Sequence, residues 1–181
     1  MRKYFLLVIF ILFPNQIFAN IKENLIQKLN STENISFNFE QNINGKVEKG
    51  KCVIKYPKKI FCEYNLANKK TLTSNGKSIV VQTKTSYYLY PLNRTPFDLI
   101  LDKNYLINKI KNSKERIVDN KFINFYFTEN DNEINIFFNK NNFNLIGWQT
   151  LDIYQNLSIT YLSKQIKNQN IKDNLFDLPK Q

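Results

Sequence analysis

The sequence contains no histidine, and this absence removes several classes of chemistry. It excludes Ser-His-Asp and Cys-His catalysis, the commonest general base near neutral pH, and every His-ligated metal site. The two cysteines cannot build a structural zinc site on their own. The four glycines are scattered, at Gly45, Gly50, Gly76 and Gly147, so no glycine-rich phosphate loop exists. We therefore expect neither a metal nor a cofactor.

The charged residues give little support for a carboxylate-based enzyme or for a nucleic-acid-binding protein. Carboxylate-only catalysis, as in glycosidases, stays open in principle. The acidic residues, however, sit mostly on alternating polar faces or in turns, where solvation explains them, so we do not expect an enzyme. The net charge of +11 falls to +9 without Arg2 and Lys3, and no Lys/Arg block is longer than a pair. Because the positive charges are spread, we expect no nucleic-acid partner.

The N-terminus has the pattern of a cleavable signal peptide. Arg2 and Lys3 precede an unbroken apolar run from Phe5 to Phe13, Pro14 breaks this run, and Ala19 is a small residue for cleavage. Nine apolar residues are too few for a membrane-spanning helix, which needs about 20. The alternative is a buried N-terminal core helix. We predict a signal peptide at residues 1–19 and a single domain at residues 20–181.

The position of the first cysteine bears on anchoring. A bacterial lipoprotein carries its acyl chains on a cysteine directly after the cleavage point, whereas the first cysteine here is Cys52. No other stretch of the sequence reaches transmembrane length. We therefore expect a soluble, exported protein without a lipid anchor.

The hydrophobic pattern predicts a mainly β protein with short helices. Apolar residues recur at helical spacing over 21–30, and from Ile35 onward the period changes to two. Strands are expected from residue 35, around 52–56 and 60–64, and at 70–74, 78–83, 86–90, 121–128, 133–139, 143–152 and 157–165. About nine antiparallel strands with alternating faces are typical of a curved or half-closed sheet with one apolar face. The 15 Phe, 10 Tyr and single Trp suit a plain core as well as a ligand cavity.

One segment in the middle of the chain interrupts the strands. Thr95 is a candidate N-cap, Pro96 stands at the first helical position, and Asp98 is an acidic residue in the first turn. We expect a helix of one to three turns over residues 95–101.

The two cysteines leave two alternatives open. Cys52 and Cys62 flank a turn at Pro57. One alternative is that they lie opposite each other in a hairpin, where an oxidising compartment permits a disulfide. Alternatively, they are two small apolar residues on one strand face.

The order of several short motifs resembles that of the outer-membrane lipoprotein carrier protein LolA family over nearly all of the chain after residue 19. The resemblance rests on Phe39-Glu40-Gln41, Gly50 to Pro57, Ile60 to Tyr64, Ser74-Asn75-Gly76-Lys77, Tyr90 to Leu101, Trp148 with Asp152, and Leu175 to Pro179. It departs from the family at Tyr56, where the best-studied form has an arginine that bonds the lid, and at Asn75, where the family has aspartate.

This resemblance implies a fold and a function. Family members form an incomplete, unclosed antiparallel β-barrel capped by helices, and they hold lipoprotein acyl chains in an apolar cavity in the periplasm. They receive cargo from an inner-membrane ABC lipoprotein exporter and pass it to an outer-membrane acceptor, without covalent chemistry. We expect a monomer. The alternatives are a periplasmic lipid-binding or lipid-sensing module with other cargo, and the outer-membrane acceptor itself, which shares the fold but is lipidated.

Strand parity and the expected helices supply the candidate site residues. The lining is expected to share the parity of Tyr56, and the lid is expected to come from the helices at 21–30 and 95–101. The candidates are Ile54, Tyr56, Ile60, Cys62 and Tyr64 for the cavity, and Leu25, Leu29, Phe97, Ile100 and Leu101 for the lid. Each of them can equally be ordinary core.

Overall fold

The structure, a computed structural model, describes residues 21–129, 132–151 and 156–180. The expected signal peptide at residues 1–19 lies outside this range. Within it, no helix is both long and apolar enough to cross a membrane.

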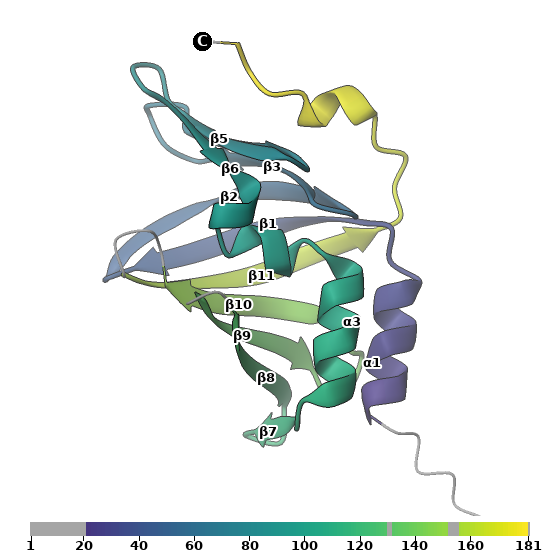
Figure 1. Ribbon diagram of the computed structural model, residues 1–181. Helices are drawn as coiled ribbons and strands as arrows, with labels where there is room; N and C mark the ends of the chain where they lie inside the picture. The colour runs from purple at the N-terminus through teal and green to yellow at the C-terminus, as the bar shows by residue number, and fades with distance from the viewer. Residues whose placement is uncertain (1–20, 130–131, 152–155, 181) are drawn as a thin grey trace, which may run out of the picture.

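A single antiparallel sheet of eleven strands forms the body of the molecule (Figure 1). The strands are β1 (Asn34–Ile43), β2 (Lys46–Lys55), β3 (Lys59–Tyr64), β4 (Thr71–Asn75), β5 (Ser78–Gln82), β6 (Tyr87–Pro91), β7 (Arg116–Val118), β8 (Phe122–Glu129), β9 (Asn132–Asn139), β10 (Leu145–Leu151) and β11 (Leu157–Lys167). Their order in space is β6-β5-β4-β3-β2-β1-β11-β10-β9-β8-β7. Because β6 and β7 stand at its two edges, the sheet is not closed, and the predicted incomplete barrel is confirmed.

Alternation along β1 shows why one face of the sheet is the inner one. Ile35, Phe37 and Phe39 are buried, whereas the residues between them are more exposed. On β2, Gly50 lies opposite Phe39, and a Cβ atom at Gly50 would collide with the carbonyl oxygen of Glu63 and with the Phe39 ring. Glycine is therefore required for the close approach of β2 to its neighbours.

Two long helices cover part of the inner face. Helix α1 (Ile21–Asn30) and helix α3 (Lys103–Asn112) lie side by side in front of the β8–β11 half of the sheet (Figure 1). Their apolar faces, which include Leu25 and Leu106, are buried against it. Helix α1 was predicted. Helix α3 was not, although Leu106, Ile107 and Ile110 have helical spacing.

The expected helix at 95–101 is shorter and starts later than predicted. A 3-10 turn η1 (Leu92–Arg94) comes first, and α2 spans only Phe97–Ile100. The hydroxyl of Thr95 donates to the carbonyl oxygen of Leu92 at 2.8 Å, so it closes the preceding turn and does not cap α2. Asp102 caps the next helix, α3, by accepting a hydrogen bond from the backbone N–H of Tyr105 at 3.0 Å.

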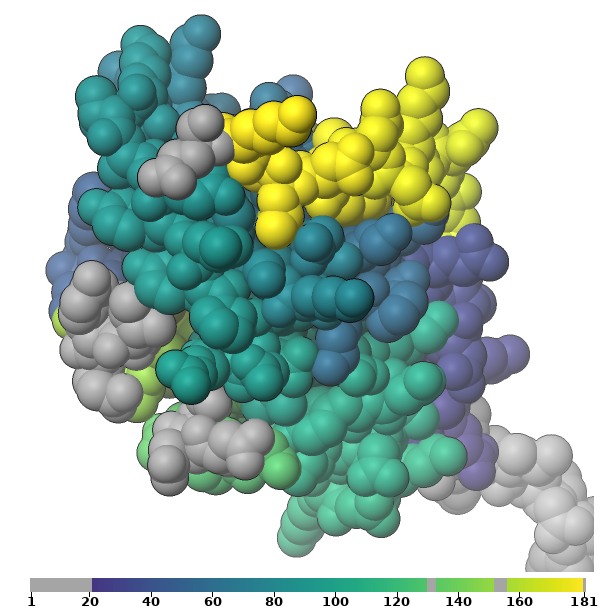
Figure 2. All heavy atoms as spheres, turned by 45° about the horizontal axis from the view of Figure 1, so that its top comes forward, coloured from purple at the N-terminus to yellow at the C-terminus, as the bar shows by residue number. Residues whose placement is uncertain are grey.

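The C-terminal segment packs on the outer face of the sheet. Its 3-10 turn η2 (Asp173–Phe176) contacts β3 and β4, and Figure 2 shows the segment in yellow against the blue and teal strands. Phe176 is buried, and Asp173 forms ion pairs with Lys55 and Lys59. This segment therefore leaves the inner face free.

Candidate functional site

An apolar cavity of about 410 Å³ lies between the inner face of the sheet and the segment of residues 92–102, which we call the covering segment. It extends over β4, β5 and β6 and reaches the ends of β1 and β10 at Ile43 and Leu151. Its apolar lining comes from Ile43, Leu72, Ile79, Val81, Tyr88, Tyr90, Phe97, Ile100, Trp148 and Leu151. The volume falls within the range of about 300–1,000 Å³ that is usual for small-ligand pockets.

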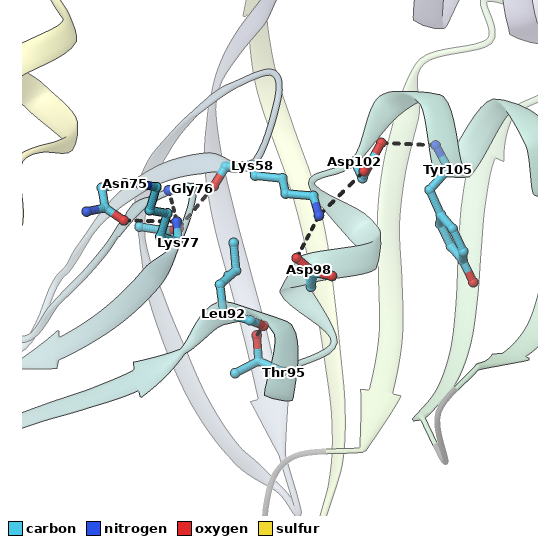
Figure 3. Close-up of polar contacts among 10 residues, drawn as sticks. Lys58, Asn75, Gly76, Lys77, Leu92, Thr95, Asp98, Asp102 and Tyr105 are labelled. Atoms are coloured by element: carbon cyan, nitrogen blue, oxygen red, sulfur yellow. Dashed lines mark hydrogen bonds and ion pairs between the residues drawn. The ribbon is translucent and has the colours of Figure 1, made fainter.

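Lys58, on the β2–β3 turn, holds the covering segment in place (Figure 3). Its Nζ atom lies 2.8 Å from Oδ1 of Asp98 and 3.6 Å from Oδ2 of Asp102. Its backbone N–H donates to the carbonyl oxygen of Leu101 at 2.9 Å, and its own carbonyl oxygen accepts from Oγ of Ser74 at 3.0 Å. The turn is thus bonded both to the sheet and to the covering segment.

The electrostatics of Lys58 favour this docking. The hydrogen bond to Asp98 raises the pKa of the Lys58 ammonium, and it outweighs the opposing effect of desolvation. The three side chains of this cluster are each between a fifth and a third exposed. Because partly exposed ion pairs contribute little individually, this cluster adds only a modest free energy to the docking of the covering segment.

The single tryptophan lies at the contact between sheet and covering segment. Trp148 is 4% exposed, and its ring meets the ring of Phe97 edge-on at a centroid distance of 6.5 Å. The Trp148 ring also meets the ring of Phe37 edge-on, at a centroid distance of 6.4 Å. Any displacement of α2 therefore changes the surroundings of Trp148.

One wall of the cavity is polar. The hydroxyl of Tyr64 donates to Oε1 of Gln41 at 3.3 Å, and Nε2 of Gln41 donates to Oγ of Ser158 at 3.0 Å. Lys70 also lines the cavity, and its Nζ atom lies 2.5 Å from Oε2 of the buried Glu48. Burial opposes ionisation of Glu48, but hydrogen bonds from lysine side chains outweigh it and lower the pKa of the carboxyl group.

The structure separates the five predicted lining residues. Tyr64 lines the cavity, whereas Ile54, Ile60 and Cys62 share its face but are buried in the core. Tyr56 borders a void of about 10 Å³ next to α1, where burial raises the pKa of its hydroxyl to about 12. No hydrogen bond from this hydroxyl to the covering segment is formed within the described part of the chain, and Lys58 makes that connection instead. The assignment of these residues to cargo contact stays a prediction.

The predicted lid residues fall into two groups, those that line the cavity and those that are buried in the core. Phe97 and Ile100 line the cavity from α2. Leu101 is fully buried, and Leu25 and Leu29 pack into the core beneath α1. Their roles in a lid likewise stay predictions.

Most of the lining was missed in the sequence. It lies on strands β4, β5, β6 and β10, which were recognised as strands but not assigned to the site. Strand alternation could have indicated these residues. In the structure, Leu72 pairs with Cys62, and Val81 pairs with Leu72 on the next strand. Extending the parity of Cys62 across two more strands leads to these cavity residues.

The cysteines are joined in the structure. Cys52 and Cys62 pair directly across β2 and β3, with Cα atoms 4.1 Å apart, and form a disulfide. The structure therefore contains the disulfide, and the alternative of two unbonded apolar cysteines does not hold. It fastens the two strands that flank the Lys58 turn.

A second lysine has an unusual environment. Lys167 borders the same small void as Tyr56, and its Nζ atom donates to Oδ1 of Asn144 at 2.8 Å. Burial, and to a lesser extent the positive charge of Lys28, lower the pKa of Lys167 to about 8. No group of three or more potential ligands for a metal ion occurs in the described ranges.

An unclosed antiparallel sheet, wrapped around an apolar cavity and covered by helices, defines the class of half-barrel proteins to which this chain belongs. The family is the LolA family: the sequence model of the outer membrane lipoprotein carrier protein LolA matches residues 30–179. None of the curated proteins matches the chain.

The chain aligns with two solved structures at low sequence identity. An uncharacterised conserved protein from Thermus thermophilus aligns with a TM-score of 0.51 at 8% identity, over 88% of this chain and 93% of that one. A LolA superfamily protein from Nitrosomonas europaea aligns with a TM-score of 0.46 at 8% identity, over 87% and 97%. At these identities the similarity concerns the fold alone.

Proposed function

We propose that this protein is a periplasmic carrier that shields the acyl chains of lipoproteins in its apolar cavity. It takes them from an inner-membrane ABC exporter and delivers them to an acceptor at the outer membrane. The observation that carries the proposal is the apolar cavity beneath a covering segment that is tied to the β2–β3 turn by the ion pairs of Lys58. Family membership supports the choice of cargo. The proposal includes neither a catalysed reaction nor a cofactor.

The energetics fit a shuttle. Each buried methylene group contributes about 0.8 kcal/mol, so a chain of about 14 methylenes left in water costs about 11 kcal/mol. The cavity of about 410 Å³ is small for several long chains. Loading therefore requires the covering segment to move away. This movement breaks the partly exposed ion pairs of Lys58, and bound acyl chains would take the place of the apolar contacts that the segment gives up.

Depletion of the protein in its host tests this role. We expect outer-membrane lipoproteins to accumulate at the inner membrane, as detected by membrane fractionation after depletion. Complementation with the wild-type gene should restore their distribution, and an unaltered distribution after depletion would refute the carrier role. An unchanged lipoprotein distribution with altered membrane phospholipids would instead favour the alternative, a lipid-binding or lipid-sensing module with non-lipoprotein cargo.

A further inference from the structure

The polar wall of the cavity has unused hydrogen-bonding capacity. In the network of Tyr64, Gln41 and Ser158, the Gln41 amide uses one of its two N–H groups, and the Ser158 hydroxyl accepts a bond while keeping its own proton to donate. Thr150 also lines the cavity, and its hydroxyl has no hydrogen-bond partner among the residues that the structure describes. The wall therefore offers neutral donors to a bound molecule.

The positive charge of Lys70, on the same wall, is already paired with a carboxylate. Lys70 is the one cationic side chain among the described lining residues, and its Nζ atom is bonded to Glu48 at 2.5 Å and stands 4.1 Å from the centroid of the Tyr64 ring. Glu48 has a side chain only 6% exposed and takes a second ion pair from Lys46 at 3.1 Å. A ligand that formed an ion pair with Lys70 would weaken the ion pair between Lys70 and the buried Glu48 carboxylate. Leaving a buried carboxylate without its full pairing costs free energy.

We propose that the cavity selects acyl chains attached through a neutral ester or amide, and that it discriminates against free fatty acids. This proposal rests on the function proposed above. An ester or amide carbonyl accepts hydrogen bonds from Gln41, Ser158 and Thr150, while the chain lies against the apolar lining. A free carboxylate also accepts such bonds, but its charge must leave water, and Lys70, the cation in the described lining, is already paired with Glu48. Acyl chains on an acylated protein carry the favoured linkages.

A displacement assay compares two ligands with the same chain. The full-length mature protein is loaded with the uncharged fluorescent probe N-phenyl-1-naphthylamine, which is then displaced by dodecanoate or by monododecanoylglycerol at pH 7.5. We expect the ester to bind at least about tenfold more tightly than the carboxylate, a factor that corresponds to about 1.4 kcal/mol. In Glu48→Gln, which frees Lys70, dodecanoate should bind about tenfold more tightly than in the wild type, with the ester little changed.

A matched variant controls for the loss of one negative charge. Glu40→Gln makes the same change on the neighbouring strand, where Glu40 pairs with Lys49 on the surface at 2.7 Å, and it should leave both affinities unchanged. If Glu48→Gln does not fold, Gln41→Leu tests the donors instead. It should weaken the ester about fivefold without changing probe affinity.

The outcomes separate the two proposals. Equal affinities for ester and carboxylate in the wild type, unchanged in Glu48→Gln and in Gln41→Leu, would overturn the selectivity and leave the carrier role intact. Failure of the probe and of both ligands to bind would overturn the carrier role and the selectivity together.

Discussion

Substitution of Lys58 by methionine is expected to loosen the covering segment while leaving the sheet intact. The change removes the ion pairs to Asp98 and Asp102 but keeps the backbone hydrogen bond to Leu101. It adds no backbone strain, since Lys58 already has a positive φ of 62° and methionine meets the same steric limits there.

The magnitude follows from the exposure of the cluster. A hydrogen bond to a charged group contributes about 1.5–3 kcal/mol when it is well buried. The side chains of Lys58, Asp98 and Asp102 are 31%, 22% and 28% exposed, so solvent screening reduces the contribution to about 1 kcal/mol. The open form should become about fivefold more populated.

Native-state hydrogen exchange measures this population. The backbone N–H of Leu101, bonded to the carbonyl oxygen of Phe97 at 2.9 Å, should exchange about five times faster in Lys58→Met, while amides of β10 keep their rates. Acrylamide quenching of Trp148 should increase in parallel, because its ring packs on Phe97. Lys58→Arg should restore much of the protection.

The neighbouring residue supplies the control. Lys59 is on the same hairpin but pairs with Asp173 of the C-terminal segment, so Lys59→Met should not change exchange in α2. Equal exchange at Leu101 in the wild type and Lys58→Met would refute the account of Lys58. The same acceleration in both lysine variants would refute it as well.

Three further changes probe the cavity, the sheet and a buried charge. Phe97→Glu should reduce probe affinity more than tenfold with a small loss of stability, whereas Ile60→Glu, at a position 1% exposed, should cost several kcal/mol and unfold the domain in a urea titration. Reduction of the Cys52–Cys62 bridge, whose cysteines are ten residues apart, should lower the free energy of unfolding by about 2–3 kcal/mol, and an unchanged urea midpoint would contradict this. Because the folded-state pKa of Lys167 lies near 8, below the usual 10.5, the unfolded chain binds more protons above pH 8. Stability should therefore rise from pH 8 to 9.5, and Lys167→Met should flatten that rise.

The β-rich part of the fold was predictable because its signal is local. On β1, Ile35, Phe37 and Phe39 alternate with polar residues, and the Asn75-Gly76 turn lies between β4 and β5 as expected. The pairing of β11 with β1 was not readable from alternation, since it joins strands more than a hundred residues apart.

The site was only partly predictable, for a related reason. Parity places Ile54 and Ile60 on the inner face, but both are buried in the core, and the cavity lies over the neighbouring strands β4, β5 and β6. The contact of Lys58 with Asp98 spans 40 residues and depends on the exact seating of a one-turn helix. No local pattern predicts such a pair.

The identity of the bound cargo tests the central claim most directly. The protein would be isolated from its natural host without detergent, and its bound molecules would be identified by native mass spectrometry. The carrier account predicts acylated N-terminal peptides or whole lipoproteins, with fewer bound in Phe97→Glu. Phospholipids or free fatty acids without any acylated peptide would contradict it.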